Sequence, residues 1–324
     1  MNQANTSVRI GVVGAGSMGR NHVRVATGLK QMHCVGIYDP NPVTGNNVAA
    51  SFGTRYYDNF DALLGDIDAL IIAAPTTVHF ELAKTAIARG IHCLIEKPIT
   101  VTVAEAEELL ALATENGVVL QVGHVERYNP VYAELKKILE GEEVLAIKAS
   151  RLSYNVSRAN DVDVVLDLMI HDIDTINQLL GRDVEVVSAV GGRYLSPSMD
   201  YASALMRSSN GAVAELTASK VSQTKNRELV ISCKDCFIRV DYLRKEIEIF
   251  RHASGKYIVE RDGVHYKHEA LIERVLVPNI ESLVAEHLNF AESVIGKETP
   301  VVSGHDGLAA LKLAIEVQNT CKIA

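Results

Sequence analysis

The sequence predicts an α/β protein with two domains. The first has a doubly wound parallel sheet, and the second is an α+β domain with a largely antiparallel, open-faced sheet. The chain has 324 residues, and a chain of this length usually forms more than one domain, each with its own hydrophobic core. Short apolar runs alternate with helical patterns as far as about residue 123, and closely spaced strand-like runs dominate beyond it. We therefore expect domains over residues 1–123 and 124–324.

Composition and charge restrict the partners. The formal net charge is −8 without any basic block, so we expect no nucleic-acid partner. No apolar run is long enough to span a bilayer, so we expect no membrane association. Residues Met1–Ser7 lack the apolar core of a signal peptide, which indicates a cytoplasmic protein.

The chain has five cysteines, an odd number, and their spacing is not that of a disulfide framework, which suggests reduced thiols. Cys233 and Cys236 form a CxxC motif between two strand-like runs. Without a second ligand pair, this motif indicates a tight hairpin more than a zinc or redox site.

The first domain alternates strands with helices. A buried strand is expected at Val8–Val13, followed by a glycine loop and a helix to about Leu29. Helical patterns at Val78–Arg89 and Val103–Asn116 are each followed by Gly, which supplies a left-handed cap. The other expected strands are Cys34–Tyr38, Ala69–Ala73, Cys93–Ile95 and Val118–Val122.

A GxGxxG motif follows the first strand and opens the first helix. Gly14 would permit the tight turn, Gly16 the approach of a pyrophosphate, and Gly19 close packing of helix on strand. The free N–H groups of the first turn, including those of Ser17 and Met18, would face the phosphates. In this context the motif predicts a Rossmann dinucleotide site.

Asp39 lies 20 positions after the last glycine of the motif, where a carboxylate accepts hydrogen bonds from the adenosine ribose. Its charge would repel the 2′-phosphate of NADP, and the following Pro40-Asn41-Pro42 offers no cation. We therefore expect NAD as the cofactor.

Two further segments end strands at the edge where doubly wound sheets bind ligands. Pro75 and Thr76 are expected to contact the cofactor, and His79 either does so or has a capping or surface role. Glu96 and Lys97 follow the next strand. Lys97 would lie beside the nicotinamide and stabilise charge on a substrate oxygen, or else form an exposed pair with Glu96.

The second domain contains a predicted helix from about Asp163 to Leu180, capped by Gly181. Asp163, Asp167, His171 and Asp174 are spaced four, four and three residues apart and would share one face. The helix itself has no Lys or Arg, so this face is expected to line a cleft. Asp167 would orient His171 as a general base, although an ordinary solvent face or a metal site is also compatible with the pattern. Hydride transfer needs no metal, and we expect none.

Three motifs together, Gly14–Gly19, Glu96-Lys97-Pro98 and Asp167-xxx-His171-xx-Asp174, resemble the Gfo/Idh/MocA oxidoreductase family. The resemblance covers nearly the whole chain. It implies NAD(P)-linked oxidation or reduction of sugars, inositols or nucleotide sugars, with Lys97, Asp167 and His171 as catalytic residues. It also implies a homo-oligomer, a dimer or tetramer, formed through the open sheet. Leu168 departs from the Gly that many members have.

A narrower resemblance involves Gly123–Pro130, Leu166–Asp174 and Ser303–Leu308, which look like the UDP-N-acetylglucosamine 3-dehydrogenase branch of that family. It implies a nucleotide-sugar substrate with one secondary hydroxyl presented to Lys97 and His171. Candidate contacts to the sugar or diphosphate are Arg127, Tyr128, Arg151, Arg158, His171 and Asp174.

Several alternatives stay open. Arg127 and Tyr128 would otherwise brace the domain junction, and the arginines would otherwise pair with the surplus carboxylates. Three other activities remain possible: an inositol or other sugar dehydrogenase, an NAD-dependent glycoside hydrolase, and a non-catalytic dinucleotide-binding regulator.

Overall fold

The computed structural model describes residues 7–154, 162–252, 256–260, 263–267 and 270–323. The chain forms two compact units: residues 1–128 with 280–312, and residues 129–279 with 313–324. The expected boundary after residue 123 therefore lies five residues later. The expectation that everything beyond it forms one domain is wrong for residues 280–312, which return to the first unit.

The first unit is built on a six-stranded parallel sheet in the order β3-β2-β1-β4-β5-β6. The order reverses between β1 and β4, which is the switch point where such sheets bind ligands. The strands are β1 (Val8–Val13), β2 (Met32–Tyr38), β3 (Arg55–Tyr57), β4 (Ala69–Ile72), β5 (His92–Glu96) and β6 (Leu120–Gly123). The expected doubly wound parallel sheet is confirmed.

Helices connect these strands, and side-chain caps begin several of them. Asn41 caps α2, Asn59 caps α3, and Thr102 forms a capping box with Glu105 at the start of α5. The segment α2-β3-α3 was not expected from the sequence, because β3 has three residues and α2 carries Gly and Asn in place of a clear apolar period. The helices of this unit are α1 (Ser17–Gly28), α2 (Pro42–Phe52), α3 (Phe60–Gly65), α4 (His79–Ile87), α5 (Val103–Asn116) and α8 (Ser282–Val294), with 3₁₀ turns at Thr76–Val78 and Val125–Tyr128.

Helix α8 belongs to the first unit because its apolar face completes that unit's core. Phe290 is fully buried in the same cluster as Ile10 of β1 and Val23 of α1. An aromatic side chain of this size buries enough apolar area to hold the returning segment in place. This contact joins parts of the chain more than 250 positions apart, so local sequence patterns carry no sign of it.

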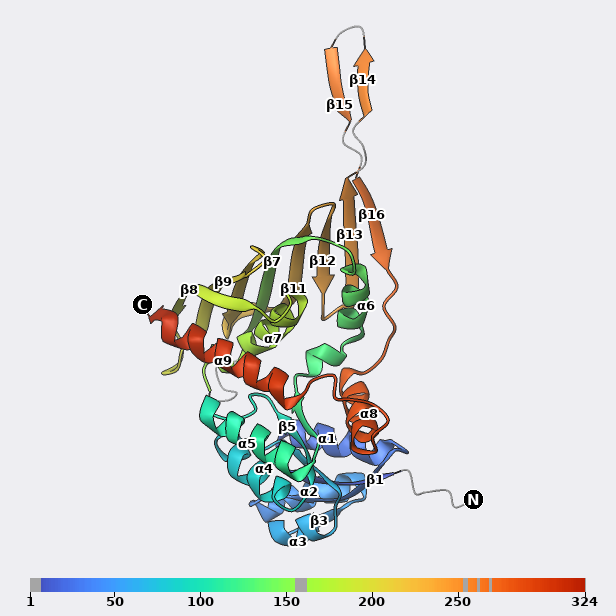
Figure 1. Cartoon of the computed structure of the whole chain (residues 1–324), viewed down its shortest axis with the longest axis vertical. Helices are drawn as coiled ribbons and strands as arrows, with labels where there is room; N and C mark the ends of the chain where they lie inside the picture. Colours follow the sequence, from blue (N-terminus) through green and yellow to red (C-terminus); the bar gives the residue numbers. More distant parts are fainter. Residues whose placement is uncertain (1–6, 155–161, 253–255, 261–262, 268–269, 324) are drawn as a thin grey trace. The chain divides into compact units, whose positions relative to one another are not determined.

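The second unit is built on a nine-stranded sheet in the order β16-β13-β12-β11-β7-β10-β9-β8-β17 (Figure 1). Its pairs are antiparallel except β10 with β7 and β17 with β8, so the expectation of a largely antiparallel sheet is confirmed. The strands are β7 (Val144–Tyr154), β8 (Val184–Gly192), β9 (Tyr201–Ser208), β10 (Val213–Ser219), β11 (Val221–Cys233), β12 (Cys236–Asp241), β13 (Glu246–His252), β16 (Ala270–Val275) and β17 (Cys321–Ile323); β14 (Lys256–Glu260) and β15 (Gly263–Lys267) form a separate hairpin.

One face of this sheet is covered by helices and the other is open. Helices α6 (Pro130–Ile138) and α7 (Ile170–Leu179) pack against the covered face, while α9 (Gly304–Thr320) begins in the first unit and ends in the second. Residues alternate between the faces along β9 and β10, which leaves Leu205 and Val213 exposed on the open side.

The predicted helix over 163–180 differs from the observed one. Its first part is a π-helical turn, η3 (Val165–Met169), which leads into α7. π turns are rare and are concentrated at functional sites, and the hydrophobic period gives no warning of them.

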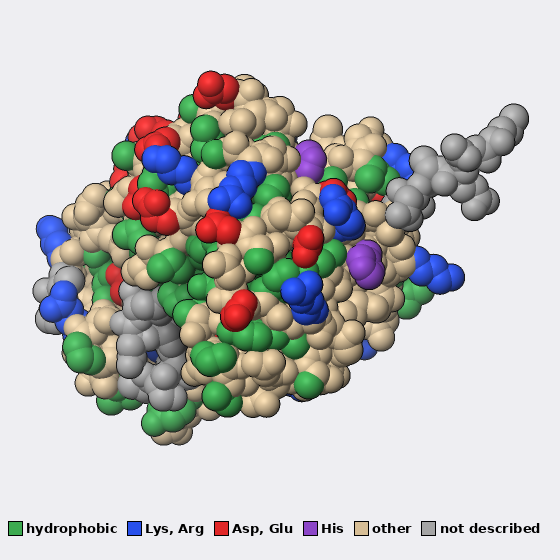
Figure 2. Space-filling view, turned by 90° about the horizontal axis from the view of Figure 1, so that it is seen from below, with side chains coloured by type: hydrophobic (Ala, Val, Ile, Leu, Met, Phe, Trp, Pro, Cys, Tyr) green, Lys and Arg blue, Asp and Glu red, His purple; other side chains and the backbone are tan. Residues whose placement is uncertain are grey.

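The face of the molecule seen in Figure 2 carries both signs of charge. Acidic and basic side chains are interspersed on the face in Figure 2. Among the described residues, no helix is both long and apolar enough to cross a membrane.

Candidate active site

The glycine loop between β1 and α1 has the geometry of a phosphate cradle. Gly14 has a φ of +96°, and a Cβ there would lie 2.4 Å from the Ala73 carbonyl oxygen. A Cβ on Gly19 would lie 1.8 Å from the Gly14 carbonyl oxygen, so neither position accepts a larger residue. A Cβ on Gly16 would meet nothing within 4 Å. Gly16 and the first residues of α1, Ser17 and Met18, are exposed, leaving room for an anion at the helix N-terminus.

Asp39 follows β2 beside this loop. Its carboxylate accepts hydrogen bonds from the backbone N–H groups of Ala15 (2.6 Å) and Asn41 (2.8 Å), which fix its orientation. Each carboxylate oxygen can accept a further hydrogen bond from a ribose hydroxyl. A cavity of about 750 Å³ opens here, lined by Val13, Gly14, Gly16, Tyr38, Asp39, Pro40, Asn41, Thr44, Ala73, Ala74, Pro75, Val78 and Leu82. The loop, the carboxylate and the cavity fit an adenine dinucleotide.

The segment after β4 closes the same cavity. Pro75 lines it, and Thr76 is buried in the 3₁₀ turn that precedes α4. His79 is 1% exposed, so the surface role considered from the sequence is wrong. Its ring nitrogens lie 3.0 Å from the Pro98 carbonyl oxygen and 2.9 Å from that of Ala74. Burial lowers the pKa of His79 despite these carbonyls, and the neutral ring donates its single N–H to one of the two.

Glu96 ends β5 and Lys97 follows it, but they do not form the exposed pair considered from the sequence. Glu96 is buried, and its carboxylate lies 2.9 Å from Nε2 of His22 in α1. Burial alone would raise the pKa of Glu96, but the hydrogen bond from His22 and the nearby charge of Lys97 act in the opposite direction, and the pKa is lowered. An ionised Glu96 anchored to α1 holds the strand end from which Lys97 projects.

The predicted acidic stripe of the second unit has partners from other elements. Asp163 accepts hydrogen bonds from the backbone N–H groups of Val165 and Leu166 and from the Gln318 amide, so it caps the helix. Asp167 forms an ion pair with Lys220, whose Nζ lies 3.0 Å from its carboxylate. Lys220 follows β10 and was not singled out from the sequence, because only the sheet brings it to the π turn.

The cations absent from the helix itself are therefore supplied by the sheet. Arg151 of β7 is buried and binds the Asp172 carboxylate through Nε and Nη2, the latter at 2.8 Å. This confirms the salt-bridge interpretation for Arg151 and removes it from the candidate diphosphate contacts. Asp174 is buried, and His171 lies on the first turn of α7. Arg158 lies outside the described residues.

Arg127 and Tyr128 are held by the returning segment of the first unit. The Arg127 guanidinium donates to the Val301 carbonyl at 3.1 Å, and the Tyr128 hydroxyl lies 2.9 Å from the Asn289 amide oxygen. Burial, with a smaller contribution from Glu286, raises the pKa of Tyr128. Both partners belong to the first unit, so these contacts hold Arg127 and Tyr128 within that unit, and bracing of the domain junction stays a prediction. A role in substrate binding stays a prediction.

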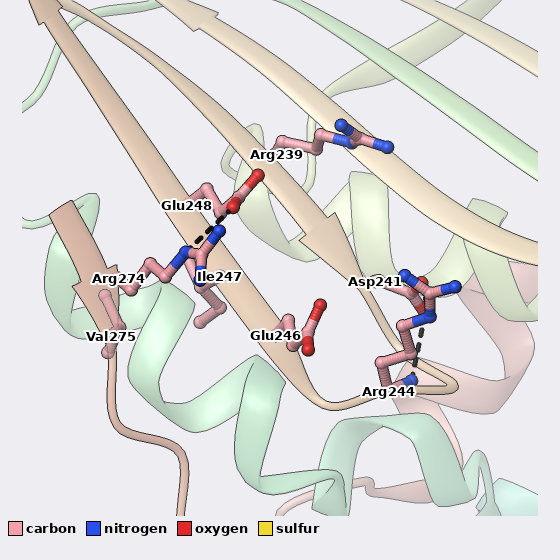
Figure 3. A pocket seen from close by; sticks show the side chains of 8 residues that line it. All are labelled: Arg239, Asp241, Arg244, Glu246, Ile247, Glu248, Arg274 and Val275. Atoms are coloured by element: carbon pink, nitrogen blue, oxygen red, sulfur yellow. Dashed lines mark hydrogen bonds and ion pairs between the residues drawn. The ribbon is translucent and has the colours of Figure 1, made fainter. Parts of the chain in front are cut away.

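A second hollow, of about 450 Å³, lies on β12, β13 and β16 of the second unit (Figure 3). Figure 3 shows Arg274 directed at Glu248 and Arg244 at Asp241, with separations of 3.2 Å and 3.7 Å. Arg239 pairs with Glu228 at 2.9 Å. These exposed charges are matched within the sheet, and the hollow contains none of the residues expected from the sequence to act on a substrate.

A model of the oxidoreductase family with an NAD-binding Rossmann fold matches residues 8–124, and a model of the GFO/IDH/MocA C-terminal domain matches residues 145–239. The chain is 33% identical over 311 residues, 96% of each chain, to UDP-N-acetylglucosamine 3-dehydrogenase from Acidithiobacillus ferrooxidans.

A solved structure of UDP-N-acetylglucosamine 3-dehydrogenase from the same organism superposes with a TM-score of 0.87 at 32% identity, covering 97% of this chain and 98% of that one. The chain is also 26% identical to scyllo-inositol 2-dehydrogenase (NAD(+)) from Bacillus subtilis, over 97% of this chain and 94% of that one. The expected NAD cofactor and oxidoreductase activity are confirmed at the level of the family. This chain is a member of the Gfo/Idh/MocA family of NAD-binding oxidoreductases.

Proposed function

We propose that this enzyme oxidises the 3-hydroxyl of the sugar in UDP-N-acetylglucosamine, giving the 3-keto sugar nucleotide and NADH. The observation that carries the proposal is the 33% identity, over 96% of each chain, to an enzyme named for that reaction. Lys97, Asp167 and His171 are all present in this sequence. Family membership supports the oxidation of a sugar hydroxyl, and the identity along the full chain supports the choice of sugar.

The chemistry is divided among these three side chains. When bound, NAD accepts the hydride from the carbon that carries the hydroxyl. His171 accepts the hydroxyl proton as general base, and Lys97 stabilises the negative charge that develops on the oxygen. Asp167 orients the imidazole, while its ion pair with Lys220 keeps the carboxylate in place. The substrate loses one hydride and one proton, so the secondary alcohol becomes a ketone and its net charge does not change.

A nucleotide sugar also needs contacts to its diphosphate and its ring. We retain Arg127, Tyr128, Arg158 and Asp174 as candidates beside the catalytic residues. Arginine suits a diphosphate because its guanidinium donates two parallel hydrogen bonds. Arg151 is excluded because it already binds Asp172 inside the second unit.

The test is a comparison of substrates in the presence of NAD. We expect NADH to form with UDP-N-acetylglucosamine at a kcat/KM at least about tenfold above that for myo-inositol or glucose, a margin of about 1.4 kcal/mol. NMR of the product should place the ketone at carbon 3. Preference for myo-inositol, or oxidation at another carbon, would reject the substrate and leave the dehydrogenase assignment intact.

The same assay separates the other activities. A hydrolase recycles its cofactor, so it would release UDP or another leaving group without net NADH. A regulator would bind NAD and turn over none of the sugars. Either result would contradict the proposed oxidation.

We also propose that the open sheet face joins copies of the chain into a dimer or tetramer. Exposed apolar side chains on that face, among them Leu205 and Val213, support this. We expect light scattering to give a mass of two or four chains, and Leu205→Asp to reduce it. The control is Val43→Asp, which changes an exposed apolar residue of the first unit in the same way and should leave the mass of the oligomer unchanged. A monomeric wild type would contradict the proposal.

A further inference from the structure

Four ionisable side chains meet inside the first unit, away from the dinucleotide cavity. His22 comes from α1, Glu96 from the end of β5, and Glu286 and His287 from α8. His22, Glu286 and His287 are each 0% exposed. Nδ1 of His22 lies 3.3 Å from Nε2 of His287, and Nε2 of His22 lies 2.9 Å from the Glu96 carboxylate. Such a cluster needs a physical reason, because burying ionisable groups is costly.

The hydrogen bonds around the cluster determine the imidazole tautomers. Nδ1 of His287 lies 2.8 Å from the Leu283 carbonyl oxygen, so this nitrogen carries a hydrogen and Nε2 has a lone pair. The carboxylate of Glu96 likewise places a hydrogen on Nε2 of His22 and a lone pair on Nδ1. The two nitrogens that face each other at 3.3 Å are therefore both acceptors, and a cation between them removes the repulsion.

Glu286 supplies the third ligand. Both of its carboxylate oxygens are buried and have no hydrogen-bond partner among the described residues. One ligand atom from each of His22, Glu286 and His287 lies within 4.8 Å of the other two.

We propose that His22, Glu286 and His287 bind a divalent metal ion, with zinc the best match to the ligand set. Two imidazoles and one carboxylate are ligands that zinc accepts. Zn–N bonds of about 2.05 Å at a tetrahedral angle place two nitrogens about 3.3 Å apart, which is the separation of Nδ1 of His22 from Nε2 of His287. The charges of Glu96 and Glu286 would balance those of the ion.

The hydrogen bonds made by the other ring nitrogens of His22 and His287 support the same assignment. Histidine ligands of metals commonly donate their other ring N–H to a carboxylate or a backbone carbonyl. Glu96 and the Leu283 carbonyl take these two roles here. The ion would connect α1 with α8 and so fasten the returning segment to the first unit. Its role is structural and independent of the substrate, and it revises the expectation from the sequence that the chain has no metal.

In a second cluster, ligand atoms of Glu142, Cys233 and Cys236 also lie within 4.8 Å of one another. The Glu142 carboxylate already accepts a hydrogen bond from the Arg251 guanidinium at 3.4 Å, whereas neither carboxylate oxygen of Glu286 accepts one from the described residues. A proton shared by His22 and His287 is the other alternative to a metal. The experiment therefore has to separate zinc at the histidines, zinc at the cysteines, and a proton.

The test uses the full chain, stripped with chelator and then supplied with Zn²⁺ or Co²⁺. We expect about one equivalent of zinc by mass spectrometry, and visible Co²⁺ bands typical of tetrahedral nitrogen and oxygen ligands without thiolate charge transfer. Glu286→Gln and His287→Gln should each weaken zinc binding at least about tenfold. The matched control His33→Gln, at an exposed position of β2, and Cys236→Ser should both retain the metal.

Three results would overturn the proposal: wild-type protein that binds no stoichiometric zinc, as a shared proton predicts; zinc retained by both cluster variants; or zinc lost in Cys236→Ser. Circular dichroism checks that each variant folds. If His287→Gln does not fold, the nearly isosteric Glu286→Gln and the Co²⁺ spectrum of the wild type decide.

Discussion

At the scale of single residues, we expect Asp39 to determine the preference for NAD over NADP. Its carboxylate is oriented by two backbone N–H groups and faces the cavity after β2. We expect Asp39→Ala to weaken NAD binding and to reduce the ratio of the affinity for NAD to that for NADP. The change removes an acceptor for the ribose and a charge that repels a 2′-phosphate. Titration of both cofactors into wild type and variant measures this.

Asp58→Ala is the matched control, since Asp58 is exposed in the same unit and does not line the cavity. It should leave both affinities unchanged. A wild type that binds NADP more tightly than NAD would show that Asp39 does not have this role.

His171 is the second residue with a defined test. Loss of a general base commonly lowers the rate by about 10²–10⁴-fold, so His171→Ala should lower kcat by that factor while the affinity for NAD stays the same. The control His305→Ala removes an exposed imidazole from α9 and should have little effect. Near-normal turnover by folded His171→Ala would assign the proton to another group, with Lys97 the first candidate.

At the scale of elements, the buried His79 lies between the loop after β4 and the loop after β5, and we expect it to make the first unit sensitive to acid. Burial lowers its pKa below the ordinary value of 6.5, so the unfolded chain binds the proton more readily than the folded one. Stability should therefore fall as the pH drops below about 6.5.

We expect His79→Gln to reduce the pH dependence of the free energy of unfolding between pH 7 and 5, by up to about 1.4 kcal/mol per pH unit. Urea unfolding at pH 7, 6 and 5 measures the slope. His33→Gln serves as the control because it removes an imidazole from an exposed position of the same unit. Identical slopes in wild type and His79→Gln would show that His79 is not the source.

At the scale of the whole molecule, the return of residues 280–312 makes the first unit discontinuous in sequence. Phe290 of α8 is fully buried in its core. Phe290→Ala should destabilise this unit by about 3–5 kcal/mol, through lost burial and the cavity left behind.

Calorimetry identifies the relevant transition as the one that NAD shifts to higher temperature. Phe290→Ala should lower its midpoint, whereas Phe237→Ala, on β12 of the other unit, should not. If Phe290→Ala leaves that midpoint in place, α8 does not stabilise the cofactor unit.

Much of the cofactor half of the site was predictable because its signals are local. Gly14, Gly16, Gly19 and Asp39 belong to one strand–turn–helix–strand unit, in which spacing along the chain fixes spacing in space. The catalytic half was only partly predictable. A helical period predicted that Asp167 orients His171, and this stays a prediction; the π turn at that place and the ion pair of Asp167 with Lys220, from the end of a strand, had no signal in the sequence.

The sequence by itself determined the two sheet types, the dinucleotide loop and the family, because backbone sterics, hydrophobic period and motif spacing act over short distances. The tertiary structure alone decided which distant charges meet. It placed Arg151 on Asp172, enclosed His22, Glu96, Glu286 and His287 in one buried cluster, and returned α8 to the first unit. These pairings follow from how whole elements bury their apolar faces, and that is a property of the packed chain that no local window of sequence contains.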